Sequence, residues 1–338
     1  MRHTWNAATH AATFLIMTLA CAGGRAEELQ PFLEAKQVKN LKLTLNKAGR
    51  PDTVKCSDVT DEVLERIGRE TTITSLEVGG TFTDKGVAHL ANLTKLRKLM
   101  LFGAITSEWG VPLKGKLPEL EELTMSGGQD VDGKKTFLFS RTSGDAFRYI
   151  ADFPNLKKFN PGTHHVYYFN NEAIRHLATP TMEVIKMAGS TAGEKKLDYS
   201  PLARCAALKE LQIPQATDND SLGQYLPKLT NLQKLRLYVC TDAIIPSVLQ
   251  VKGLEYLEGR SCQFSADKIK QLAALPNLSS INLSAPLDRD QLLALKEIKS
   301  LKAAQVTARD QASIDALKAA RPDLKLVATI NAGEKKAK

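Results

Sequence analysis

Residues 232–253, LQKLRLYVCTDAIIPSVLQVKG, contain one complete unit of a pattern that recurs along the chain. Its opening leucines have L-x-x-L-x-L spacing: Leu232, Leu235 and Leu237. Alternate side chains of a strand point to opposite faces, so the second and third leucines face a core while the residues between them face outward. The pair Thr241-Asp242 then precedes an apolar run, as at the start of a helix. One unit therefore predicts a short strand, a turn and a helix.

The same six-residue opening recurs along the whole chain. It occurs as ITSLEV from Ile73, LRKLML from Leu96, LEELTM from Leu120, LKKFNP from Leu156, MEVIKM from Met182, LKELQI from Leu208, LQKLRL from Leu232, LEYLEG from Leu254, LSSINL from Leu278, LKAAQV from Leu301 and LKLVAT from Leu324. Successive openings are 23, 24, 36, 26, 26, 24, 22, 24, 23 and 23 residues apart. A unit of this length has too little apolar surface to fold alone, so the pattern predicts units that stack on one another.

These residues resemble the leucine-rich-repeat family, whose pattern is L-x-x-L-x-L-x-x-N/C-x-L, over roughly residues 51–330. The unit length is most similar to helix-bearing subclasses, the ribonuclease-inhibitor-like and cysteine-containing repeats, and to secreted bacterial proteins built from such repeats. The resemblance implies an α/β fold: a curved, right-handed solenoid with a parallel β-sheet on the concave face and helices on the convex face. Phe159 and Gly259 replace expected aliphatic residues and indicate local irregularity.

The ends of the chain differ from the repeats. Residues 1–26 have a basic start, a short apolar run and small residues, which predicts a signal peptide cleaved after Ala22 or Ala26. A lipid anchor on Cys21 is a less favoured alternative, because Thr18 stands where that signal usually has leucine. Residues 27–56 are expected to form an N-terminal cap with a β-hairpin, residues 51–330 the solenoid, and residues 331–338 a disordered basic tail. The protein is thus expected to be secreted, or located in the periplasm or cell envelope.

Charge and composition limit the partners. The formal net charge is +9, but the lysines are spread out rather than clustered in a stripe, which argues against a nucleic-acid partner. Beyond the leader, the chain has no apolar stretch long enough to cross a membrane. We expect a monomer without a cofactor or a metal, whose partner is a protein or another macromolecule of unknown identity.

Two cysteines occupy the same position in neighbouring units, Cys240 and Cys262. Adjacent strands lie about 4.8 Å apart, so a disulfide is sterically conceivable. We favour the alternative of two separate buried thiols. Cys56 is expected in the same position of the first unit, and Cys205 in the core.

Candidate binding residues come from outward strand positions. Two neighbouring units present a charged and aromatic patch: Lys234, Arg236, Tyr238, Tyr256, Glu258 and Arg260. Such a composition is typical of recognition surfaces. The alternative, equally weighted, is a solvated face with internal Arg–Glu pairing.

The long interval contains an insertion, residues 126–155, and loops of this kind often leave a solenoid on its binding side. Aromatic residues gather in and after it, and we prefer the interpretation that they fill gaps in the leucine pattern. A secondary binding set comprises Met100, Phe102, Trp109, Phe137 and Phe139, with the alternative for Trp109 that it packs on the insertion.

No catalytic motif stands out. The adjacent pair His164-His165 is a poor metal pair, since neighbouring residues of an extended chain point apart, and the fragment Asp130-Val131-Asp132-Gly133 lacks the remaining ligands of a calcium loop. The sequence therefore predicts a non-enzymatic, exported protein that binds a macromolecule through its concave sheet and the insertion. The alternatives are an enzyme acting on polysaccharide, which needs paired carboxylates, and an envelope structural element without a specific ligand.

Overall fold

The computed structural model describes residues 26–106, 108–127, 129–131, 134–136, 147–160, 170–187, 196–213 and 221–331, without the side chains of residues 26–27 and 126–136. Residues 1–25 of the expected signal peptide, with Cys21, residues 332–338 of the expected tail, and Phe137 and Phe139 therefore lie outside the described residues.

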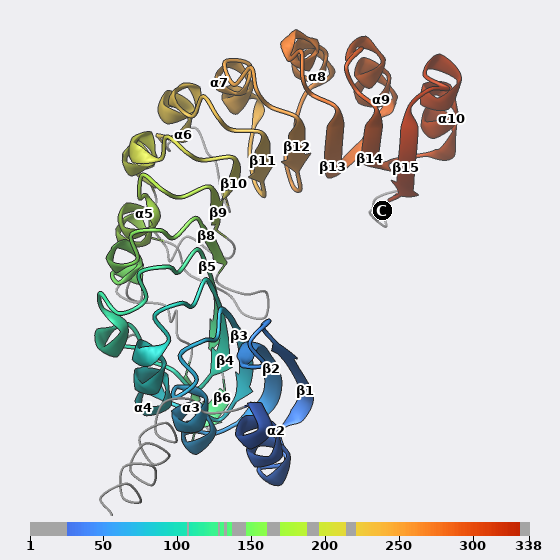
Figure 1. The fold of residues 1–338 in the computed structure, drawn as a ribbon. Coiled ribbons are helices and arrows are strands. Elements are labelled where there is room, and N and C mark those ends of the chain that lie inside the picture. Colours follow the sequence, from blue (N-terminus) through green and yellow to red (C-terminus); the bar gives the residue numbers. More distant parts are fainter. Residues whose placement is uncertain are drawn as a thin grey trace, which may run out of the picture.

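The described chain forms a curved solenoid (Figure 1), with the sheet lining the inner side of the arc and the helices on its outer side. One sheet of 13 strands runs through this part of the molecule, and from β2 onward every neighbouring pair is parallel. Its strands, in spatial order, are β1 (Lys39–Leu45), β2 (Pro51–Val59), β3 (Ser75–Gly80), β4 (Lys98–Gly103), β5 (Glu122–Gly127), β8 (Lys158–Asn160), β9 (Val184–Lys186), β10 (Glu210–Ile213), β11 (Lys234–Leu237), β12 (Tyr256–Gly259), β13 (Ser280–Leu287), β14 (Ala303–Ala308) and β15 (Lys325–Ile330).

Short helices return the chain from one strand to the next. The α-helices are α2 (Ala26–Ala35), α3 (Asp61–Ile67), α4 (Asp84–Ala88), α5 (Asn171–Leu177), α6 (Leu222–Tyr225), α7 (Ile245–Val248), α8 (Ala266–Gln271), α9 (Arg289–Ala294) and α10 (Gln311–Ala320). The 3₁₀ turns are η1 (His89–Asn92), η2 (Val111–Leu113), η4 (Ile150–Asp152), η5 (Ser200–Arg204), η6 (Leu226–Lys228), η7 (Asp242–Ile244), η8 (Leu272–Ala274) and η9 (Leu295–Glu297). Several repeats therefore use tight 3₁₀ turns where the sequence pattern predicts a continuous helix.

The repeat register predicted from the leucines is confirmed. Each of the strands from β3 to β14 that belongs to the large sheet begins two residues after a predicted opening, and β15 begins one residue after. Leu99 pairs with Leu123, and Leu235 pairs with Leu257, on neighbouring strands. All four side chains are at most 1% exposed, so the leucines form continuous buried columns that no single coil could bury alone.

Consecutive coils are also coupled where their helices begin. Thr241 caps η7, as predicted, and Thr83 caps α4 in the same way. The carboxylate of Asp61, at the start of α3, accepts hydrogen bonds from the backbone N–H of Thr83 (2.7 Å), the hydroxyl of Thr83 (2.8 Å) and the N–H of Gly86 (3.1 Å). Asp61, in the first turn of α3, therefore satisfies hydrogen-bond donors at the start of the next helix, α4.

At the N-terminal end, β1 and β2 pair as an antiparallel hairpin around Gly49, which has a left-handed φ of 72°. Leu29 and Leu33 of α2 are fully buried against this end of the core. The hairpin and α2 together cover apolar side chains that an open end of the stack would expose.

The longest repeat unit, between the openings at Leu120 and Leu156, contains a buried aromatic cluster. Strand β5 pairs directly with β8, so the long interval between them does not interrupt the sheet, and within it β6 (Gln129–Val131) and β7 (Lys134–Thr136) form a separate antiparallel pair. Among the described residues between β7 and the end of β8, four aromatic side chains are buried: Phe147, Tyr149, Phe153 and Phe159. These four fill the core, as the gap-filling interpretation predicted.

Trp109 belongs to the same cluster and is fully buried, with its ring centroid 5.7 Å from that of Tyr149 and 6.0 Å from that of Phe153. Trp109 thus packs on aromatic residues of the insertion, the alternative that the sequence offered, and its burial leaves it no surface to offer to a ligand as a member of the binding set.

The structure joins Cys240 and Cys262 in a disulfide, with an S–S distance of 2.06 Å and a Cα–Cα distance of 4.6 Å. The preference for two separate thiols is therefore wrong, since the equivalent turn positions bring both sulfurs within bonding reach. Cys56 does not occupy that position: it lies within β2, beside Val78 of β3, as a buried core residue. Cys205 is buried as expected, and burial raises the pKa of its thiol to about 12.

Candidate functional site

The predicted patch lies on the concave face at strands β11 and β12 and is centred on Arg236. The guanidinium of Arg236 lies between two carboxylates from neighbouring strands: Nη1 is 2.8 Å from Oε1 of Glu210, and Nε is 3.3 Å from Oε2 of Glu258. Parallel pairing determines this geometry: Arg236 and Glu258 occupy one register position on β11 and β12, and Glu210 lies one outward position earlier on β10, level with Lys234. The pairing thus brings charges from three coils close together.

Glu258 is the most buried charged side chain of the patch, with 9% of its side chain exposed. Its carboxylate accepts hydrogen bonds from the hydroxyl of Tyr256 (2.9 Å) and from Nε of Arg260 (2.9 Å). Burying a carboxylate is costly unless its oxygens are paired, and here two arginines and a phenol supply the partners. Burial, and the hydrogen bond to Glu258, raise the pKa of Tyr256.

Each arginine also covers an aromatic ring. The Arg236 guanidinium lies 5.5 Å from the ring centroid of Tyr256, and that of Arg260 lies 4.4 Å from the ring of Tyr238. Stacking of this kind limits the rotamers of both partners. The patch is therefore a cross-linked set of side chains rather than a freely solvated face.

Five of the six predicted patch residues belong to this network, and the sixth, Lys234, is exposed beside it without an ion pair in the part of the chain described. Sequence reasoning left two participants out of the site. Glu210 holds Arg236, and Lys186 lies 3.6 Å from Glu210 through its Nζ. Both occupy outward strand positions, with Lys186 level with Gln212 and Glu210 one outward position earlier, but strands β9 and β10 lack the aromatic residues that marked the next two strands.

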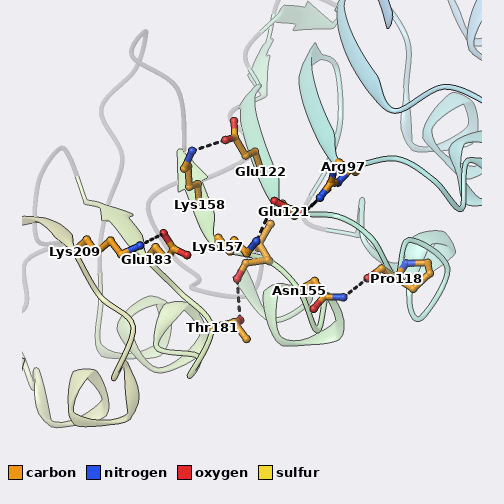
Figure 2. A network of polar contacts seen from close by, with 11 residues as sticks. Arg97, Pro118, Glu121, Glu122, Asn155, Lys157, Lys158, Thr181, Glu183 and Lys209 are labelled. Carbon is orange, nitrogen blue, oxygen red and sulfur yellow. Dashed lines mark hydrogen bonds and ion pairs between the residues drawn. The ribbon is translucent and has the colours of Figure 1, made fainter. Parts of the chain in front are cut away.

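The same alternation of charge continues towards the N-terminal half (Figure 2). The carboxylate of Glu122 lies 2.5 Å from Nζ of Lys158, the pair shown in Figure 2. On its other side, Nζ of Lys98 is 3.8 Å from the Glu122 carboxylate. One residue earlier in each unit, Glu121 accepts hydrogen bonds from Arg97 and Lys157, which lower its pKa. These pairs connect β5 to β8 across the insertion and so help to specify which strands are neighbours.

The secondary residues lie at the other end of the sheet. Met100 and Phe102 of β4 are half-buried on the concave face, and Phe102 borders a hollow of about 610 Å³ beside the hairpin. The hollow is also lined by Leu41, Lys55, Glu77 and Gly79. It carries one ion pair, between Lys55 and Glu77 at 2.5 Å, and lies several strands away from Arg236. The structure therefore does not bring the two predicted sets together.

Metal ligation finds no support among the described residues, which contain no cluster of three or more His, Cys, Asp or Glu side chains suited to an ion. Of the motifs considered for a metal, His164-His165 and the Asp132-Gly133 pair lie outside the described residues. No helix in the part of the chain that the structure describes is long and apolar enough to span a bilayer.

Comparisons with known proteins identify the fold. No protein-family model matches the chain, and a search of curated proteins finds no significant match. An internalin (inlF) from Listeria monocytogenes is similar in structure, with a TM-score of 0.51 and 16% identity over 91% of this chain and 90% of the internalin chain. A leucine-rich-repeat protein from Leptospira interrogans is also matched, with a TM-score of 0.42 and 15% identity over 78% of this chain and 74% of that one. Together with the repeat register, the likeness to the internalin shows that this chain has the leucine-rich-repeat fold.

Proposed function

We propose that this protein is an exported, non-enzymatic scaffold that binds another macromolecule through its concave sheet. The observation that carries the proposal is the network around Glu258, in which ion pairs, a phenol and two stacked arginines hold an accessible charged surface in one arrangement. A surface that is ordered before binding loses little conformational entropy when the partner arrives. The likeness in fold to the internalin supports the proposal by analogy only.

A test should alter the exposed residues at the edge of the network, because substitutions of buried residues such as Glu258 would disturb the fold. A concave variant replaces Lys186, Lys234 and Tyr238 by alanine, and a matched control replaces Lys252, Lys318 and Tyr225, two lysines and a tyrosine from outside the sheet, in the same way. Both are used, with the unaltered protein, to capture partners from an envelope extract, followed by quantitative mass spectrometry. We expect the concave variant to lose partners that the control retains; equal recovery by all three proteins would refute the proposal.

Export is tested separately. N-terminal sequencing of protein recovered from the producing organism is expected to begin at Gly23 or Glu27, the residues that follow the two predicted cleavage sites. A chain that retains the leader and remains inside the cell would contradict this part of the proposal without affecting the binding face.

A further inference from the structure

We infer that the partner is an acidic protein, held mainly by positive charge on strands β9 to β12. The inference rests on the proposed function, because it concerns the same concave face, and it adds the chemical class of the partner. It follows from which charges of the patch are neutralised internally and which remain accessible.

The outward positions of these four strands, together with the residue that follows β12, carry more cations than carboxylates. The cations are Lys186, Lys234, Arg236 and Arg260, and the carboxylates are Glu210 and Glu258, so four positive charges less two negative charges leave a net charge of +2. Each carboxylate is already shared by two cations: Glu210 by Lys186 and Arg236, and Glu258 by Arg236 and Arg260. The acidic groups of the patch are thus occupied within the protein.

The acidic and basic side chains of the patch also differ in how far they are exposed to solvent. The side chains of Glu210 and Glu258 are 14% and 9% exposed, whereas those of Lys186, Arg236 and Arg260 are 34%, 28% and 53% exposed. An approaching molecule therefore meets lysine and arginine first, together with the unpaired Lys234 described above. Surplus charge of one sign on a concave surface attracts the opposite sign and raises the rate of association.

The aromatic residues favour a protein over a nucleic acid. Single strands are bound by aromatic rings on which bases can stack. Here Arg236 and Arg260 cover one face of the Tyr256 and Tyr238 rings. Beside Tyr238, the side chain of Val239 is 46% exposed, and an apolar contact next to charged residues is typical of protein interfaces.

The test measures the binding of defined polymers to the full-length protein by fluorescence anisotropy. Fluorescent poly-L-glutamate is the probe, and poly-L-lysine and single-stranded DNA of similar length are the comparisons. We expect poly-L-glutamate to bind most tightly, and its Kd to rise about tenfold or more when the double charge reversal Lys186→Glu, Lys234→Glu is introduced. The matched reversal Lys252→Glu, Lys318→Glu makes the same change in net charge outside the sheet and should raise the Kd far less.

Melting curves of both variants verify that they fold, and the milder pair Lys186→Gln, Lys234→Gln replaces the reversal if it does not. Three results would overturn the inference: no binding of poly-L-glutamate, tighter binding of DNA or poly-L-lysine, or an equal effect of the two reversals. None of these results would contradict the proposed function, provided that the alanine variant of the concave face still loses partners that the matched alanine control captures.

Discussion

At the scale of single residues, the network around Arg236 shows how a charged side chain in a sheet surface is paired with partners from neighbouring coils. Arg236 contacts Glu210 and Glu258 at once, and Glu258 is held in addition by Arg260 and Tyr256. Removing one member of such a network leaves the remaining charges desolvated and incompletely paired. The resulting loss of folding free energy is larger than the net contribution of the intact ion pair.

We therefore expect Arg236→Met to lower the free energy of unfolding by about 2 kcal/mol, because two carboxylates lose the cation between them. Urea denaturation monitored by circular dichroism measures the change. The neighbouring substitution Lys234→Met is the control, since it removes a similar charge without an internal ion pair, and it should alter stability by less than about 0.5 kcal/mol. Equal effects of the two substitutions would show that the network contributes nothing.

The raised pKa of Tyr256 predicts a dependence on alkaline pH. The folded state retains the phenolic proton where the unfolded state, with a tyrosine pKa of about 10, loses it. The contribution of Tyr256 to stability is therefore complete below pH ~10 and is lost as the pH rises through its folded pKa. Tyrosinate absorbance near 295 nm, compared between the unaltered protein and Tyr256→Phe, should place this ionisation above that of an ordinary tyrosine; ionisation at or below pH ~10 would contradict the burial and the bond to Glu258.

At the scale of the elements, adjacent coils are joined by more than the leucine columns. The disulfide connects the turn after β11 to the turn after β12, directly beyond the strands that carry Arg236 and Glu258. Gly259 of β12 leaves room for Phe264, whose ring lies 3.2 Å from the point where a Cβ atom would be. The departure from the leucine pattern at this glycine is thus a packing adjustment made with the next turn.

A covalent link between coils that are 22 residues apart restricts the unfolded chain. We expect the double substitution Cys240→Ala, Cys262→Ala to lower the free energy of unfolding by about 3 kcal/mol, a value based on the entropy of loop closure. Guanidinium denaturation with and without reductant gives the measurement, and the buried thiol variant Cys205→Ala is the control for losing a sulfur atom from the core. A midpoint that does not respond to reductant in the unaltered protein would mean that the bond does not form.

At the scale of the whole molecule, stability is a sum over stacked coils rather than the property of one compact core. Central strands are hydrogen-bonded on both sides, whereas β1 and β15 stand at the two edges of the sheet. On β15 the side chains of Val327 and Ile330 are 53% and 52% exposed, so the last coil buries less apolar surface than the coils before it.

Hydrogen exchange should therefore be uneven along the arc. We expect amides of β11 to β13 to be protected the longest and those of β15 to exchange first, because opening an end coil breaks contacts with one neighbour only. Exchange followed by mass spectrometry with peptide-level coverage resolves these segments. Uniform protection across the sheet would instead indicate a single cooperative unit and would contradict the additive description.

The sequence predicted the elements and missed particular contacts, and the residues show why. The repeat openings at Leu96, Leu232 and Leu254 predicted where their strands begin. The alternation of apolar and polar residues and the constant repeat length can both be recognised in the local sequence. Trp109 was misassigned, since its burial depends on Tyr149 and Phe153, which the insertion returns to it from 40 and 44 residues further along. Within the patch, Arg236 and Glu258 were found from their register, but the involvement of Glu210 required the side-chain geometry.

The sequence by itself determined the leucine-rich-repeat fold, the parallel order of the strands and the residues on each face, because these follow from spacing within one unit and its repetition. Only the tertiary structure decided which cysteines are bonded, which aromatics are buried and how the charges of the concave face are shared. Those outcomes depend on distances between side chains of different coils, and a repeating pattern constrains the positions of the backbones without specifying which of the neighbouring side chains will meet.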